Sequence, residues 1–276
     1  MKFKKFLLST VIMLCVVFFP VTTHAAQKRL ITLSPNHTYT QYDVTSDGKN
    51  DKLKIVFLPC KKLQFYINNK KAYSPNVKNV SDIDIELCTL SNKNNYMHLK
   101  QRTSANDYLK SDIFLTYKSG KLVTAVNTLT HTKNVNHGRF ECTVSKVNNS
   151  TIRTREQIMF YGIGLVDYYV TYKPSGNKLV PTSNIFPLVY DESRENFWTT
   201  ATKLKVTCLN HAFISVPPGD NCKIYKIKFD RMVSWAYYSP MVYMKFIKYD
   251  GSLYNSCWLA CPNNYTSEYF WESIYI

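Results

Sequence analysis

The chain has 276 residues and a formal net charge of +16, with 45% hydrophobic and 20% charged residues. This balance predicts a folded protein with a core and excludes a disordered chain. Aromatic residues reach 14% and there are only 8 glycines, which excludes collagen-like and low-complexity classes. A chain of this length accommodates one or two domains.

The first 26 residues have the pattern of a secretory signal peptide. Three lysines precede an apolar core at residues 6–20, which is shorter than the roughly 20 residues of a membrane span. The small residues Ala25 and Ala26 predict cleavage there. We therefore expect a secreted, extracellular chain without stable membrane insertion. A bacterial cell surface is the alternative location. An uncleaved anchor helix and a lipid anchor at Cys15 are the alternatives.

Charge indicates the class of partner. Cleavage would leave 32 basic and 19 acidic residues, a net charge of +13. Such a surplus favours anionic partners, and outside a cell these are anionic cell-wall polymers or peptidoglycan. The basic residues are scattered, with pairs at Lys61–Lys62 and Lys70–Lys71, so we expect no nucleic-acid partner. A basic surface that is merely solvated is the alternative.

Seven cysteines follow the signal peptide, so at least one is unpaired or pairs between molecules. An extracellular compartment permits disulfides. The intervals Cys208 to Cys222 and Cys257 to Cys261 are the two that we expect strands to bring within bridging distance.

Alternation of polar and apolar residues predicts strands. It is clearest at 52–57, 82–87, 203–208 and 224–229, where period two places one face on a core. Long helical periodicity is absent after the signal peptide. We therefore predict an all-β fold.

Glycines and a weak repeat predict the connections. The similar segments 114–123 and 170–180 each place a glycine, Gly120 and Gly176, where a hairpin turns. Repeated hairpins build antiparallel meanders, arranged as propeller blades or as a sandwich.

A domain boundary is expected beside the polar run 191–196. All four tryptophans follow it. We predict an N-terminal β domain at 27–195 and a small β domain at 196–276.

The segment 43–51 is a candidate calcium loop. Oxygen-bearing side chains stand at loop positions one, three, five and nine, with a glycine at the sixth position for a sharp turn. Calcium is bound by six to eight oxygens, from such side chains and a backbone carbonyl. An EF-hand is excluded because a lysine occupies position twelve and a strand follows. An Asp-Gly turn without metal is the alternative. The predicted ligands are Asp43, Thr45, Asp47, Lys49 (carbonyl) and Asp51.

This loop resembles the calcium loops of FG-GAP and VCBS-type repeats. Together with the following strands, it resembles a group of secreted proteins of clostridia-type bacteria. Residues 214–227, with 249–251 and 258–260, are similar to the bacterial Src-homology-three-like barrel that ends many of those proteins. The resemblance implies a small barrel at the C-terminus. A cysteine, Cys257, stands where these barrels have a glycine, and residues 230–243 form a long insertion.

Motifs of catalysis are sparse. The chain has neither an H-E-x-x-H zinc helix nor a G-x-S-x-G nucleophile elbow. A zinc site of His131, His137 and Cys142 with Cys208 or His211 lacks the spacing of known sites. A Cys–His hydrolase lacks its local signature. We therefore assign no catalytic residue.

An acidic row at Asp82, Asp84 and Glu86 has two interpretations. It can supply a carboxylate pair for glycoside hydrolysis. It can also face Lys52 and Lys54 across a sheet, which explains three carboxylates on one strand face better.

The aromatic residues Trp235, Tyr237, Tyr238 and Tyr243 are candidate ligand contacts, since flat rings with polar tips suit sugars and peptides. Core packing is the alternative. The sequence thus favours a secreted, non-enzymatic, calcium-stabilised binding protein that contacts cell-wall or cell-surface glycan or peptide. A secreted hydrolase with an unrecognised site, or a purely structural surface protein, are the alternatives.

Overall fold

The computed structural model describes residues 29–90, 94–103, 109–131, 139–160 and 164–189, and beyond these the strands between 198 and 260. Apart from one 3-10 turn, η1 (Thr128–His131), every regular element in these ranges is a strand. The strands form four sheets by antiparallel pairing. The prediction of an all-β fold of antiparallel hairpins is confirmed. Within the described residues, no helix is long and apolar enough to cross a membrane.

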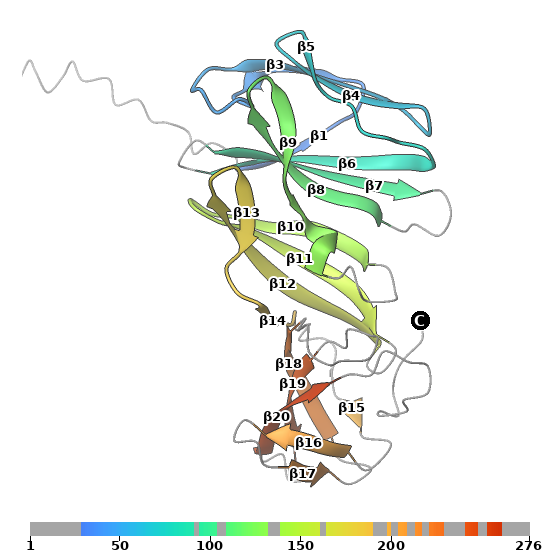
Figure 1. Cartoon of the computed structure of the whole chain (residues 1–276), viewed down its shortest axis with the longest axis vertical. Coiled ribbons are helices and arrows are strands. Elements are labelled where there is room, and N and C mark those ends of the chain that lie inside the picture. The colour runs from blue at the N-terminus through green and yellow to red at the C-terminus, as the bar shows by residue number, and fades with distance from the viewer. Residues whose placement is uncertain are drawn as a thin grey trace, which may run out of the picture.

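Two sheets are built from the first half of the chain (Figure 1). The outer sheet is a four-stranded meander in the order β2-β3-β4-β5, and the central sheet has five strands in the order β1-β6-β7-β8-β9. The outer strands are β2 (Thr38–Tyr42), β3 (Asp51–Leu58), β4 (Lys62–Ile67) and β5 (Lys70–Tyr73). The central strands are β1 (Leu30–Leu33), β6 (Val80–Thr89), β7 (Asn95–Thr103), β8 (Leu109–Lys118) and β9 (Lys121–Asn127).

The second half of the chain forms the third sheet and the C-terminal sheet. The third sheet is a meander of β10 (Arg139–Val147), β11 (Ile152–Phe160), β12 (Gly164–Ser175) and β13 (Lys178–Pro181). The C-terminal sheet has seven strands. They are β14 (Ile185–Pro187), β15 (Trp198–Thr199), β16 (Leu204–Cys208), β17 (Phe213–Val216), β18 (Asn221–Lys228), β19 (Met241–Ile247) and β20 (Leu253–Ala260).

An apolar core lies between the outer and central sheets. Alternation in β3 buries Leu53, Ile55 and Phe57 and leaves the even-numbered residues on the other side. The central sheet contributes residues such as Ile85 and Leu99 from its facing side. Period-two patterning of this kind directs one strand face into a core, as the sequence predicted for this segment.

Both glycine hairpins of the repeat are present. Gly120 joins β8 to β9 with φ of +86°, and Gly176 joins β12 to β13 with φ of +59°. Residues with a Cβ adopt such positive φ values only at a steric cost, which glycine avoids at both turns. The β4–β5 turn uses Asn68 and Asn69 instead, both at positive φ, because asparagine tolerates this conformation better than most side chains.

The opposite side of the central sheet faces the third sheet (Figure 1). Several polar residues on this side are buried, among them His98, Lys100 and Asp112. The third sheet contributes Cys142 and Glu156 to this interface. These two residues lie opposite each other in the β10–β11 register and are also buried. This second core contains the candidate site.

The division at residue 195 stays a prediction, as does the Src-homology-three-like barrel. One strand crosses the predicted domain boundary: β14 precedes residue 195 but pairs with β18 of the C-terminal sheet. In that sheet Cys208 lies opposite Cys257 in the β16–β20 register, a pairing that the sequence intervals did not suggest.

Candidate functional site

A histidine held between two carboxylates marks the centre of the second core. His98 comes from β7, Glu86 from the neighbouring β6 and Asp112 from β8 on the other side. Glu86 Oε2 lies 3.0 Å from Nδ1, and Asp112 Oδ1 lies 2.8 Å from Nε2. Period two places all three side chains on one face of the central sheet.

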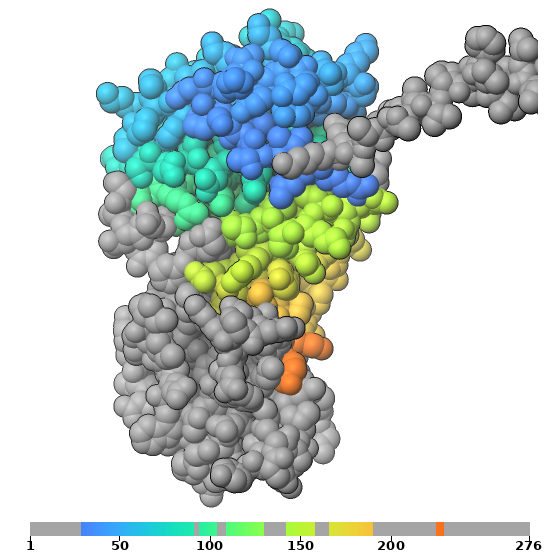
Figure 2. Space-filling view, turned by 180° about the vertical axis from the view of Figure 1, so that it is seen from behind, coloured from blue at the N-terminus to red at the C-terminus, as the bar shows by residue number. Residues whose placement is uncertain are grey.

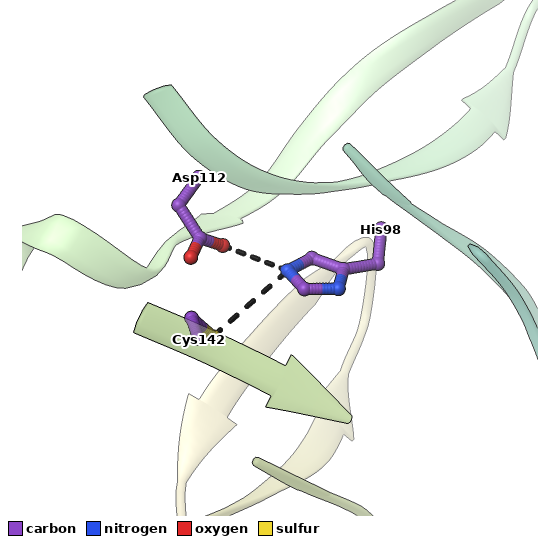
Figure 3. Close-up of side chains that lie close together, drawn as sticks. All are labelled: His98, Asp112 and Cys142. Atoms are coloured by element: carbon purple, nitrogen blue, oxygen red, sulfur yellow. Dashed lines mark hydrogen bonds and ion pairs between the residues drawn. The ribbon is translucent and has the colours of Figure 1, made fainter. Parts of the chain in front are cut away.

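Cys142 completes the cluster from the third sheet. Its Sγ lies 4.0 Å from His98 Nε2. One ligand atom each from His98, Asp112 and Cys142 falls within a mutual distance of 4.8 Å. Figure 3 shows Nε2 directed at both the carboxylate and the sulfur. All three residues have 0% relative exposure, so this is an interior site.

Two further contacts fix the cluster. The His98 ring stacks on Phe114 with centroids 4.3 Å apart and planes inclined by 9°. The Thr128 hydroxyl of η1 donates to the backbone carbonyl of Asp112 at 3.1 Å. The imidazole is therefore held in plane by an aromatic ring and in orientation by hydrogen bonds.

The charges around His98 set its protonation. Complete burial alone would lower the pKa of His98, but the attraction and hydrogen bond of Asp112, reinforced by Glu86, raise the pKa above its ordinary value of 6.5. Burial, reinforced by the negative charge of Glu86, raises the pKa of the nearby Cys88 thiol well above its ordinary value. Cys88 is therefore kept as a thiol.

A second buried acid lies in the third sheet. Glu156 has 0% relative exposure and accepts hydrogen bonds from the Tyr168 hydroxyl and the Tyr172 hydroxyl, each at 3.1 Å. The Thr154 hydroxyl donates to the same carboxylate at 3.0 Å. Tyr172 also contacts Phe114, with ring centroids 6.1 Å apart. The His98 cluster and the Glu156 cluster thus lie in the same layer between the central and third sheets.

The acidic row of β6 is paired, but not with the residues that we expected. Asp84 lies 3.0 Å from the Lys100 ammonium and 3.5 Å from the Arg102 guanidinium. Burial raises the pKa of Asp84, but Lys100 and Arg102 outweigh it and hold the pKa below its usual range. The expectation that Lys52 and Lys54 face this row is wrong, because β3 belongs to the outer sheet and β6 pairs with β7 and β1.

The predicted calcium loop folds around its own backbone amides. Asp43 accepts from the N–H groups of Asp47 at 3.1 Å and Gly48 at 2.8 Å. Asp51 is buried and accepts from the N–H groups of Val44 and Thr45, both at 2.8 Å.

Asp51 also accepts at 2.6 Å from the Asn68 side chain, so its carboxylate joins the loop to the β4–β5 turn. Within the described residues, the loop aspartates do not form a group as close as that at His98. The Thr45 hydroxyl oxygen is buried and has no hydrogen-bond partner.

Several predicted residues lie beyond what the structure describes. Trp235, Tyr237 and Tyr238 are outside the described residues, and Tyr243 lies in β19 with only its backbone described. Of the histidines proposed as zinc ligands with Cys142, His131 ends η1 with only its backbone described. His137 and His211 lie outside the described residues. The aromatic contacts remain a prediction.

A lysine-rich face covers the far side of the outer sheet. Between Asp51 and Asp82 there is no acidic residue, and all seven lysines in this stretch are exposed. One row across the strands reads Thr38, Lys54, Tyr66 and Lys71 in register. Figure 2 shows this part of the chain, in blue, at one end of the molecule. We call Lys52, Lys54, Lys62 and Lys71 the lysine face.

Sequence reasoning missed His98 and Asp112. A signal was present, because His98, Lys100 and Arg102 repeat with period two and match the acidic row Asp82, Asp84 and Glu86. Two complementary rows on adjacent strands predict that the strands pair with opposite charges facing each other, as the β6–β7 register shows.

A search of family models, of curated proteins and of solved structures found no match for this chain. The resemblance to calcium-loop and barrel proteins therefore stays a prediction, and function has to be argued from the residues described above.

Proposed function

We propose that this chain is a secreted, non-enzymatic binding protein and that the lysine face contacts an anionic cell-wall polymer. The single observation that carries the proposal is this face, which has four exposed lysines and no acidic residue between positions 52 and 81. Lysine ammonium groups on a regular β surface repeat about every 7 Å along a strand, which suits a polymer with repeating anionic groups. Tyr66 and Gln64, joined by a 2.7 Å hydrogen bond, add flat and polar contacts at its centre.

The buried cluster does not favour a hydrolase. A catalytic nucleophile has to reach substrate, whereas His98, Asp112 and Cys142 are all fully buried. The four lysines of the lysine face, in contrast, are all exposed. This difference supports binding over catalysis.

Co-sedimentation with purified bacterial cell walls tests the proposal. The variant K54Q/K62Q/K71Q removes three charges from the lysine face, and K118Q/K121Q/K173Q removes three exposed charges elsewhere. If each exposed contact contributes about 0.2–1 kcal/mol, affinity falls by a factor of roughly 3 to 160 in the first variant.

The second variant is the matched control, and its affinity should stay close to that of the wild type. Equal losses in both variants would mean that net charge alone drives binding. Absence of binding by the unmodified protein would refute the proposal outright.

Calcium stabilisation forms part of the same proposal. Asp43, Asp47, the orphaned Thr45 hydroxyl and the Lys49 carbonyl are the oxygens offered, while Asp51 closes the loop. An extracellular site with Kd of about 10⁻⁴–10⁻³ M would add roughly 0.4–1.4 kcal/mol at millimolar calcium. Thermal unfolding in calcium and in chelator measures it. D43N should abolish the difference, and equal melting temperatures in both buffers would refute the calcium site.

The aromatic segment is a second contact that we propose on sequence grounds. W235A/Y238A should weaken wall binding without lowering the melting temperature. Unchanged binding would remove Trp235 and Tyr238 from the contact surface while leaving the lysine face in place.

A further inference from the structure

We propose that His98, Asp112 and Cys142 form a buried zinc site that joins the central sheet to the third sheet. The three ligands come from β7, β8 and β10 and so from both sheets. Thiolate sulfur, imidazole nitrogen and carboxylate oxygen together are a donor set typical of zinc, whereas calcium and magnesium take oxygen alone. This site is distinct from the predicted calcium loop in residues and in chemistry.

The spacing of the donor atoms suits an ion of this size. Bonds of about 2.0–2.3 Å in a tetrahedron place ligand atoms roughly 3.3–3.8 Å apart. The Nε2–Sγ distance of 4.0 Å and the Nε2–Oδ1 distance of 2.8 Å lie on either side of this range. A shift of about half an ångström in the two side chains replaces the hydrogen bond with coordination to the metal. The second Asp112 oxygen or a water fills the fourth position.

Glu86 provides the outer contact that metal-binding histidines usually have. Its carboxylate lies 3.0 Å from Nδ1, the ring nitrogen that faces away from Cys142. A proton held on Nδ1 by a carboxylate leaves the lone pair of Nε2 for the metal. Stacking on Phe114 fixes the plane in which that lone pair points.

Charge also favours a dication at this position. Two carboxylates and a thiol share an interior volume in which Cys142 and Asp112 are fully buried and the Glu86 side chain is 19% exposed. Anions removed from water need compensation nearby. A dication meets this need for a thiolate and a carboxylate at once, and it ties β10 to the central sheet.

Cobalt substitution tests the site directly. The purified protein is unfolded in guanidinium, stripped with chelator and refolded with Co²⁺, so that burial does not block entry. We expect about one equivalent bound, with a thiolate-to-cobalt charge-transfer band in the near ultraviolet and visible bands of tetrahedral cobalt. Zinc should displace the cobalt and remove both sets of bands.

Variants assign the ligands. C142S should lose the charge-transfer band, whereas C88S, which alters another buried thiol on the central sheet, and C60S, which alters an exposed thiol, should keep it. E86Q keeps all three ligands and should lower cobalt affinity about 10–100-fold, which tests the site even if C142S does not fold. An unmodified protein that refolds without the band, an equal band in C142S, or unchanged affinity in E86Q would overturn the proposal.

Discussion

The two faces of the central sheet are buried in different ways. The face toward the outer sheet packs Ile85, Leu99 and their neighbours against Leu53 and Phe65, with apolar atoms on both sides. The face toward the third sheet buries a histidine between two carboxylates, and the third sheet that covers it buries an acid among three hydroxyl groups. Both faces belong to the same strands, so the difference is in the side chains and not in the backbone.

The apolar face and the polar face of the central sheet differ in how strictly they depend on particular partners. Apolar burial stabilises without demanding exact partners, at about 25 cal/mol for each Å² removed from water. A buried polar group stabilises only when its partners are in place, and it is costly when one of them is missing. The first core is therefore expected to tolerate changes that conserve volume. The second is expected to tolerate only changes that conserve hydrogen bonding and charge.

The largest effect is expected in the apolar core. Phe65 has 0% relative exposure between the two sheets, and F65A should destabilise the protein by about 3–5 kcal/mol because it removes apolar contacts and leaves a cavity. Urea unfolding measures the change. K62A, on the exposed side of the same strand, should stay within about 0.5 kcal/mol. A similar loss in both variants would show that β4 does not depend on its buried face.

An intermediate effect is expected at Glu156. E156Q keeps the shape but replaces one of the two carboxyl oxygens that accept the three hydroxyl bonds with an amide nitrogen, and we expect a loss of about 1–3 kcal/mol. Y172F should cost about 1 kcal/mol in the unmodified protein and less in the E156Q background. Urea unfolding of the four proteins completes a double-mutant cycle. Strict additivity would mean that Tyr172 and Glu156 do not stabilise each other.

The first core was accessible to sequence reasoning and the second was not. Alternation at 52–57 and 82–87 predicted both the strands and their apolar faces, because period two needs only local information. The partners of Glu86 depend on which strands are neighbours, and alternation does not encode neighbours. The lysines at 52 and 54 were therefore assigned to the wrong sheet. Cys142 meets His98 across two sheets and 44 positions of sequence, a contact that only the tertiary fold determines.

The predicted calcium loop at residues 43–51 shows the same limit on a smaller scale. Its residues predicted a tight turn with inward oxygens, and the turn is present with Gly48 at φ of +87°. The sequence did not predict that the Asp51 carboxylate would accept hydrogen bonds from the backbone N–H groups of Val44 and Thr45. Those bonds give partners to backbone N–H groups that the turn withdraws from water.

The smallest effect is expected at the exposed rim of the polar face. Asp84 pairs with Lys100 and Arg102, but its side chain is 43% exposed, so D84N should cost less than about 1 kcal/mol at neutral pH. Because the pKa of Asp84 is held below its ordinary 3.8 in the folded state, this contribution is present above that value. It is lost as the pH falls through the folded-state pKa.

Urea unfolding of D84N and the unmodified protein at pH 7 and at successively lower pH therefore should show a difference that shrinks on acidification. D82N, at the exposed end of the same row, is the matched control and should show a smaller difference at pH 7. A D84N difference that grew in acid would mean that burial outweighs the two cations at Asp84. The cost of removing Asp84 from water would then dominate at the exposed rim of the polar face.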